Sequence, residues 1–304
     1  MTPLIALWTG WFLFAVYPLI GNMAAGNISP LLLTFLGAGI GFLCFVPHFI
    51  KNKFFAQLFN RKLIFPLLMM GLLGSVIPVM LFLGALKYTT PANMAILAQV
   101  EVVYSIIMAR IFLKERITLP QLGGTLLVVF GASLILAKER FSPRLVGDLM
   151  VIAAPWMFQV SHVFAKKLPK DLTPGFIAGG RAFYAFISAI PIVIGTLFFT
   201  SMIFKPGIKV GFVMLLWGIG LNGASLLLWY KAIRNMDLAK ATAIILSYPV
   251  ATFILSAVLG FEKVHLYQFI GLVCSLGGAY WITLLVKKAE VKKEIIKENE
   301  EDLK

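Results

Sequence analysis

The chain has 304 residues, of which 60% are hydrophobic and 13% are charged, about half the charged fraction of an average soluble domain. Its mean hydropathy is +0.92, although its formal net charge is +14. This composition excludes an ordinary soluble domain. It predicts an all-α integral membrane protein, because apolar stretches of about 20 residues satisfy their own backbone groups in lipid by forming helices.

Ten apolar stretches follow one another along the chain, each near the roughly 20 residues that cross a bilayer as a helix. We expect transmembrane helices at 2–22, 29–49, 63–86, 91–113, 118–137, 146–165, 173–200, 210–233, 238–260 and 264–286. No Lys or Arg precedes the first stretch, so it lacks the charged start of a signal peptide and is expected to stay as a helix.

The second half of the chain repeats the first, with a constant offset of 147 residues between 85–132 and 232–279. Ala85, Glu115, Gln121, Gly124 and Gly131 recur as Ala232, Glu262, Gln268, Gly271 and Gly278. Because each copy has five helices, an odd number, the second copy is expected upside down relative to the first. The sequence therefore predicts two inverted five-helix repeats, 1–140 and 145–286, and a charged cytoplasmic tail, 287–304. Such duplication is typical of secondary transporters, whose substrate site lies between the repeats near the bilayer midplane.

The basic residues lie in loops and at helix ends, which is a topology signal and not the basic face of a nucleic-acid-binding protein. With the N-terminus in the cytoplasm, cytoplasmic segments carry 17 Lys and Arg and outer loops carry 7. Without the tail the count is 11 against 7. We therefore expect a multi-pass protein of the cytoplasmic (inner) membrane with both termini in the cytoplasm.

Glu101 lies about ten residues into the fourth stretch, roughly 15 Å from its end at 1.5 Å per residue. A charged side chain at that depth costs about 2.5–3.5 kcal/mol, so it should face a cavity or a partner. It is expected to bind a cationic substrate group or to carry a coupling proton. The alternative is a structural hydrogen bond to a neighbouring helix. Its counterpart in the second copy is Tyr248.

Further polar and aromatic side chains are candidates for the lining of the same cavity. They are Trp11, Gln99, Trp156, Gln159 and Asn222, together with Tyr248. Each has a simpler alternative, an interhelical hydrogen bond for the amides and packing or an interfacial belt for the tryptophans. Arg181, about eight residues into its stretch, would make a salt bridge, a structural pair or a contact with a substrate carboxylate.

Two glycine patterns have structural explanations. Residues 218–223 match the dinucleotide fingerprint GxGxxG, but they lie inside an apolar stretch with no preceding strand, so the match is rejected. Gly124 and Gly131, like Gly271 and Gly278, are seven residues apart on one helix face. These glycines are expected to allow close packing, either between helices of one chain or in a homodimer.

A family resemblance rests on the segment Phe112-Leu113-Lys114-Glu115-Arg116-Ile117 and on its repeat at Gly260-Phe261-Glu262-Lys263. With the glutamines and glycines that follow each segment, the chain resembles the EamA-type branch of the drug/metabolite transporter superfamily over nearly its full length. The resemblance implies a cavity built from helices one, three, four, six, eight and nine, and a role in moving amino acids, metabolites or drugs. Two positions depart from the family pattern. Val102 stands where the second copy has Pro249, and Leu36-Gly37-Ala38 stand where the second copy has Arg181.

The leading hypothesis is a secondary active transporter that exports a small organic metabolite, an amino acid or a related solute, by alternating access. A solute gradient or protons would drive it, because the chain contains no Walker A motif. The alternatives are an exporter of multiple drugs or cationic compounds, an importer of the same fold, a channel, or a helper subunit. A membrane enzyme is disfavoured, because neither HExxH nor GxSxG occurs and no second acid accompanies Glu101 at its depth. No catalytic residue, metal or cofactor is expected. The expected partners are a small-molecule substrate, the lipid bilayer and coupling protons.

Overall fold

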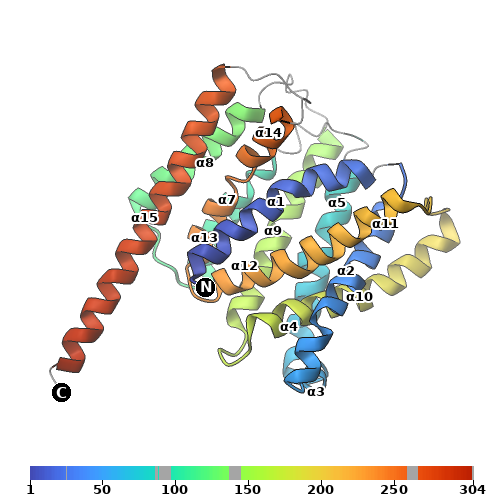
Figure 1. The fold of residues 1–304 in the computed structure, drawn as a ribbon, viewed down its shortest axis with the longest axis horizontal. Coiled ribbons are helices and arrows are strands. Elements are labelled where there is room, and N and C mark those ends of the chain that lie inside the picture. The colour runs from blue at the N-terminus through green and yellow to red at the C-terminus, as the bar shows by residue number, and fades with distance from the viewer. Residues whose placement is uncertain (25, 86–87, 89–96, 137–144, 259–265, 303–304) are drawn as a thin grey trace.

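The structure is a computed structural model that describes residues 1–304 except 25, 86–87, 89–96, 137–144, 259–265 and 303–304. The described residues are almost entirely helical (Figure 1). The first copy contains α1 Pro3–Ala24, α2 Pro30–Lys51, α3 Phe55–Leu58, α4 Arg61–Gly71, η1 Leu72–Val76, α5 Ile77–Ala85, α7 Glu101–Phe112 and α8 Leu119–Leu136. The second contains α9 Leu145–Lys167, α10 Pro174–Phe199, α11 Ile208–Leu215, η2 Leu216–Ser225, α12 Leu226–Ile233, α13 Leu238–Ile245, α14 Pro249–Val258 and α15 Leu266–Asp302.

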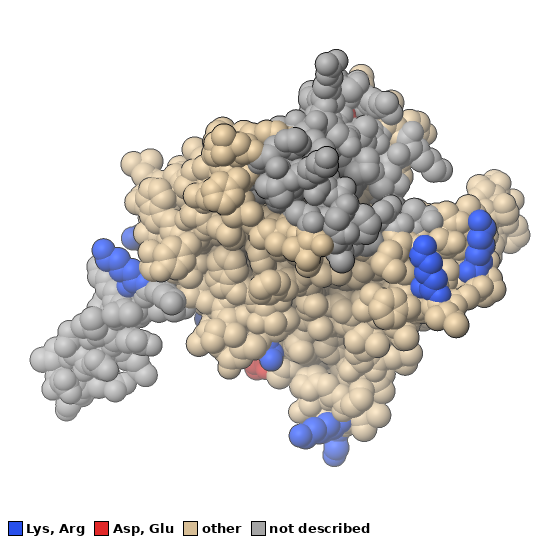
Figure 2. Space-filling view, turned by 45° about the horizontal axis from the view of Figure 1, so that its top comes forward, with Lys and Arg blue, Asp and Glu red and all other residues tan. Residues whose placement is uncertain are grey.

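The outer surface of the helical bundle is apolar, as a protein embedded in lipid requires. Large hydrophobic side chains are widely exposed, including Leu119 at 82%, Phe199 at 88% and Ile208 at 95%. Lys and Arg lie towards the edges of the molecule in Figure 2, and the broad area between them carries few charges. Among the described residues, six helices are long and apolar enough to cross a membrane, and two shorter apolar helices accompany them. The chain is therefore an all-helical membrane protein.

Each expected span contains a helical segment, but four of the spans are not simple α-helices. The third and eighth combine α-helices with a stretch of π-helix, η1 in one and η2 in the other. The ninth is divided into α13 and α14 by a turn at 246–248. In the fourth, a turn at 99–100 immediately precedes α7.

The continuous fourth helix expected over 91–113 is therefore wrong within the described residues, since Glu101 begins α7 instead of lying inside a helix. The break in the ninth span has a clear cause. Pro249 is the first residue of α14, where a missing backbone N–H and a fixed φ are tolerated. The fourth span has no proline there. Its turn is held instead by hydrogen bonds from the Val102 and Val103 amides to the carbonyls of Gln99 and Val100.

The helix pairings follow the duplication. The helices α2 and α10, and likewise α8 and α15, pack as pairs of equivalent elements. In the same way α1 packs against η2 and α12 of the second copy, and α9 packs against α4, η1 and α5 of the first. Exchanging the two copies thus maps these contacts onto one another.

The glycine contacts between α8 and α15 are also related by exchange of the two copies. A Cβ atom on Gly278 would lie 2.6 Å from the carbonyl oxygen of Gly124, and one on Gly131 would collide with the carbonyl of Gly271 and the amide of Ser275. The pairs 124–278 and 131–271 make the helices antiparallel, and an offset of 147 converts one pair into the other. These glycine faces pack within one chain.

The charged tail continues the last helix. In Figure 1, α15 runs beside α8 and then extends beyond the rest of the bundle towards the C-terminus. Residues 287–302 belong to this helix, so most of the charged tail is helical.

Substituting Gly131 tests the α8–α15 contact. Gly131→Ala is expected to lower stability by about 1–3 kcal/mol, because the added methyl meets backbone atoms that cannot move aside. The matched control is Gly277→Ala, where a Cβ meets nothing within 4 Å, so helix propensity alone should make it neutral or stabilising. Thermal unfolding of the detergent-solubilised variants measures both. Equal melting temperatures for the two would contradict the contact.

Candidate functional site

A cavity of about 190 Å³ lies at the centre of the bundle, between the two copies. Its lining comes from α1, α2, η1, α5, α7, α9, α10, η2, α12 and α13, and from Ala98 and the turns at 99–100 and 246–248. The polar lining residues are Thr34, Ser75, Gln99, Glu101, His162, Arg181, Asn222, Ser225 and Tyr248. The remaining lining is apolar and includes the aromatic residues Phe14, Phe82, Phe158, Trp217 and Trp229.

The interrupted helices meet at this cavity. Gln99 and Glu101 border the turn before α7, and Leu246 and Tyr248 border the turn between α13 and α14. Because an offset of 147 relates Gln99 to Leu246 and Glu101 to Tyr248, the two breaks are equivalent in the two copies. Discontinuous helices that line a polar cavity between repeats are the arrangement in which transporters bind substrates.

Glu101 receives one hydrogen bond from the described part of the chain. The buried amide of Gln159 on α9 donates to its Oε1 at 2.9 Å. No Lys, Arg or His nitrogen of the described residues lies within 4.0 Å of its carboxylate. The charge of Glu101 therefore has one neutral donor and borders a cavity.

Arg181 is held in a fixed position by neutral acceptors. Only 5% of it is exposed. Its Nε donates to Ser75 Oγ at 3.0 Å, its Nη1 to the Tyr230 hydroxyl at 2.9 Å, and its Nη2 to the carbonyl of Gly74. Among the described residues, no carboxylate oxygen lies within 4.0 Å of a side-chain nitrogen of Arg181. The guanidinium thus carries a positive charge to the cavity wall without an anionic partner in that part of the chain.

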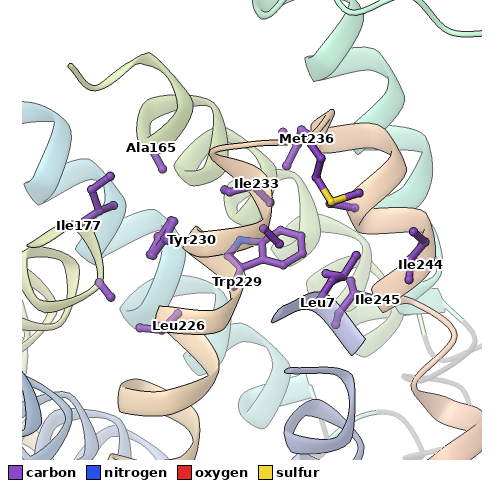
Figure 3. Packing of buried hydrophobic residues seen from close by; sticks show 14 of the residues in the cluster. Leu7, Ala165, Ile177, Leu226, Trp229, Tyr230, Ile233, Met236, Ile244 and Ile245 are labelled. Carbon is purple, nitrogen blue, oxygen red and sulfur yellow. The ribbon is translucent and has the colours of Figure 1, made fainter. Parts of the chain in front are cut away.

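The helix α12 supplies Tyr230, which accepts a hydrogen bond from Arg181, and Trp229, which lines the cavity. It directs Tyr230 towards Ile177 of α10 and Trp229 to the other side, towards Leu7 (Figure 3). The indole Nε1 of Trp229 donates to His162 Nδ1 at 3.1 Å. Because indole nitrogen only donates, Nδ1 of His162 must be unprotonated, which leaves its proton on Nε2.

The two copies line the cavity differently. Glu101 on α7 corresponds to Tyr248, whose ring centroid lies 6.5 Å from that of Phe14. Counted from the prolines that begin the two helices, Pro30 in α2 and Pro174 in α10, Gly37 is the position equivalent to Arg181. A Cβ atom on Gly37 would collide with the indole of Trp217, so this position has no room for a side chain. The two charged residues of the lining, Glu101 and Arg181, therefore have no charged counterpart in the other copy.

The site residues expected from the sequence divide into three groups. Gln99, Glu101, Asn222 and Tyr248 line the cavity. Trp11 and Gln159 are buried beside it, where Trp11 Nε1 donates to Ser247 Oγ at 2.9 Å. Trp156 is 38% exposed and is absent from the lining, so the structure separates it from the others.

Sequence reasoning missed His162, Trp217 and Trp229 as lining residues. His162 lies near the end of its expected span, where ionisable residues are ordinary, and the tryptophans lie in uniformly apolar stretches. The role of Arg181 stays open on the sequence alone. Its depth in an apolar stretch is the usable signal, because intramembrane charges usually face a cavity or a partner.

Comparison with known proteins identifies the family. The model of the EamA-like transporter family matches residues 1–137 and again 145–284. The chain belongs to the EamA-like transporter family. Both copies of the duplicated unit are thus EamA domains, and residues 218–223 belong to the second of them and not to a dinucleotide-binding unit.

Three curated relatives carry names that describe uncharacterized transporters. YyaM of Bacillus subtilis is 25% identical over 209 residues, which cover 65% of this chain and 66% of that protein. A transporter of Methanothermobacter thermautotrophicus is 25% identical over 264 residues, which cover 79% of this chain and 74% of that transporter. YetK of Bacillus subtilis is 25% identical over 84% and 79%, respectively. A solved crystal structure, 21% identical, matches the fold with a TM-score of 0.79 over 93% of this chain and 98% of that one.

Proposed function

We propose that this EamA-family transporter is a secondary exporter of a small zwitterionic metabolite, of the amino-acid class, and that it works by alternating access in the cytoplasmic membrane. One observation carries this proposal: Glu101 and Arg181 border the same cavity, and neither has an oppositely charged partner within 4.0 Å among the described residues. A solute with an ammonium group and a carboxylate would complement both. Export is taken from the family resemblance.

The size and charge of the cavity favour this solute over the alternative of cationic drugs. Pockets for drug-sized ligands usually measure about 300–1,000 Å³, whereas this cavity measures about 190 Å³. A purely cationic compound would also meet the like charge of Arg181. The aromatic side chains of the lining would pack against an apolar part of the solute.

The proposed topology has ten transmembrane helices in two inverted repeats, 1–140 and 145–286, followed by the tail 287–304. The antiparallel exchange of glycine contacts between α8 and α15 supports the inversion. The excess of Lys and Arg in the even-numbered loops and the tail supports cytoplasmic placement of both termini.

Alternating access requires a closure that can break, and Glu115 provides one at the end assigned to the cytoplasm. It follows α7 and accepts hydrogen bonds from the amides of Leu238 at 2.8 Å and Ala239 at 3.3 Å, at the start of α13. Lys166 of α9 pairs with it at 2.9 Å and also donates to the Met236 carbonyl. The helices α7, α9 and α13 all contribute to the cavity. The contacts of Glu115 with Lys166, Leu238 and Ala239 therefore hold these three helices together at one end of it.

Glu101→Gln tests the role of the acidic group. The substitution is expected to reduce transport by about tenfold or more, because a hydrogen bond to a charged group contributes about 1.5–3 kcal/mol. If Glu101 also carries the coupling proton, the pH dependence of transport should flatten. Uptake into liposomes reconstituted with purified protein measures both, with Asp237→Asn as a charge-matched control. Unchanged rate and pH profile would remove Glu101 from the site.

Arg181→Gln tests recognition of the carboxylate. The wild-type protein should bind an amino acid about tenfold or more tightly than the matching amine that lacks the carboxylate, and the variant should lose that preference. Ligand-induced thermal shifts compare the two compounds. Tyr230→Phe is the control, because it removes one contact of Arg181 and keeps the charge. A preference that survives in Arg181→Gln would contradict the proposed contact.

Glu115→Gln tests the closure. Loss of the pair with Lys166 should raise access from the cytoplasmic side by about tenfold, because about 1.4 kcal/mol changes a conformational equilibrium by that factor. In a background without Cys44 and Cys274, the labelling rate of Leu246→Cys in inside-out vesicles reports this access. Lys240→Gln is the control, because its partner Asp237 is three residues away in the same turn. Equal labelling in all variants would show that Glu115 is not part of a closure.

A further inference from the structure

A second hollow lies outside the central cavity, between α2, the start of α10 and the η2–α12 segment. It is a groove of about 530 Å³. Its apolar lining includes Phe45, Ile219, Ala224 and Leu227, and its polar lining includes His48 and Lys231. The described residues that line it contain no Asp or Glu. Ile219 and Ala224 are exposed, so the groove opens on the lipid-facing surface of the bundle.

The η2 segment separates this groove from the central cavity. Trp217, Leu221 and Ser225 line the cavity, whereas Ile219, Gly223 and Ala224 line the groove. A Cβ atom on Gly223 would lie 3.6 Å from the Sγ of Cys44, so η2 and α2 are in close contact at the base of the groove. Whatever occupies the groove therefore touches a helix that also forms the cavity wall.

Lys231 defines one end of the groove. It is partly buried near the end of α12, and its side chain has no hydrogen-bond or carboxylate partner among the described residues. Snorkelling of a lysine to the membrane surface would explain its position. It would not explain why the lysine lies at the end of an apolar groove that lacks acidic residues.

The length of the groove matches one leaflet. Twelve residues separate Ile219 from Lys231, a rise of about 18 Å at 1.5 Å per residue, slightly less in the π-helical part. Half of a bilayer's hydrocarbon core is about 15 Å. A fatty acyl chain lying along Leu227, Ala224 and Ile219 would reach the middle of the membrane while its headgroup stayed beside Lys231.

We infer that this groove is a specific site for an anionic phospholipid of one leaflet, with its phosphate at Lys231 and one acyl chain against η2. A single cation without a neighbouring carboxylate suits a headgroup of net negative charge better than a zwitterionic choline headgroup. The hydroxyl of Thr173 and the ring of His48, which hydrogen-bond each other at 3.2 Å, line the same end. The site is independent of the proposed substrate.

Native mass spectrometry of the full chain in detergent tests the headgroup. Phosphatidylglycerol and phosphatidylcholine with identical acyl chains are titrated against wild type, Lys231→Gln and Lys231→Arg. Wild type and Lys231→Arg are expected to prefer phosphatidylglycerol. In Lys231→Gln the preference should fall by about fivefold, the equivalent of the ~1 kcal/mol contributed by a lysine near an anionic membrane surface. Lys170→Gln, an exposed loop position, is the matched control and should behave like wild type.

Two further arms distinguish the occupant. Ala224→Phe fills the wall of the groove and is expected to reduce the binding of both lipids, whereas inorganic phosphate is expected neither to displace phosphatidylglycerol nor to raise the melting temperature. Displacement by phosphate would identify a site for the free anion and overturn the lipid site. An unchanged headgroup preference in Lys231→Gln, or unchanged binding of both lipids to Ala224→Phe, would overturn it as well.

Discussion

Backbone groups that lose their helical partners inside a bilayer must find other partners, since lipid supplies none, and this constraint fixes where the chain can be irregular. The breaks before Glu101 and at 246–248 both border the central cavity, where polar groups and water can serve instead. The wide turns of η1 and η2 also contribute to its wall. The regular helices α8 and α15, which stand apart from the cavity, instead pack glycine against backbone. The irregular backbone and the central cavity thus occupy the same layer of the protein.

Within that layer, the backbones of the two copies are related by symmetry, but their side chains differ. The helix breaks remain equivalent, although Pro249 explains only one of them and the first copy has Val102 at that position. The charges do not remain equivalent. The residue of the second copy that is equivalent to Glu101 is Tyr248. The residue of the first copy that is equivalent to Arg181 is Gly37, and the indole of Trp217 fills the space beside it. Charged groups repeated by the symmetry would suit a symmetrical ion, whereas one acid and one base at non-equivalent positions suit the proposed zwitterionic solute, held in one orientation.

Sequence reasoning succeeds where a physical signal is strong and local. The ten apolar stretches locate the helices, and the offset of 147 pairs Glu101 with Tyr248 from residue identities alone. Depth marks Glu101, because a carboxylate is costly in lipid. The same offset relates the glycines of α8 and α15, but it does not distinguish packing within a chain from packing between chains.

Which side of each helix points into the protein is harder to predict. Lipid is as apolar as a protein core, so residues that face lipid and residues that face the core have similar hydrophobicity. On α1, the stripe that includes Trp11 and Phe12 is uniformly apolar in sequence, yet Trp11 is 5% exposed and Phe12 is 62% exposed. Trp156, in an equally apolar stretch, is 38% exposed and lies outside the described lining of the cavity. The break before Glu101 is also unpredictable, since no glycine or proline marks it.

The sharing of η2 between the cavity and the outer groove has a mechanical consequence. A π-helix is rare and appears mostly as a single-turn bulge inside an α-helix, so the ten-residue stretch η2 is expected to depend on the residues packed against it. Here Ile40 and Gly37 of α2 lie against Gly218 on one part of η2, and Asn222 donates to the Trp217 carbonyl within it. On the groove side, Gly223 lies against Cys44, and Ile219 and Ala224 are exposed. An acyl chain there would complete the packing of η2, so that lipid composition would influence the position of Trp217 and Asn222 at the cavity wall.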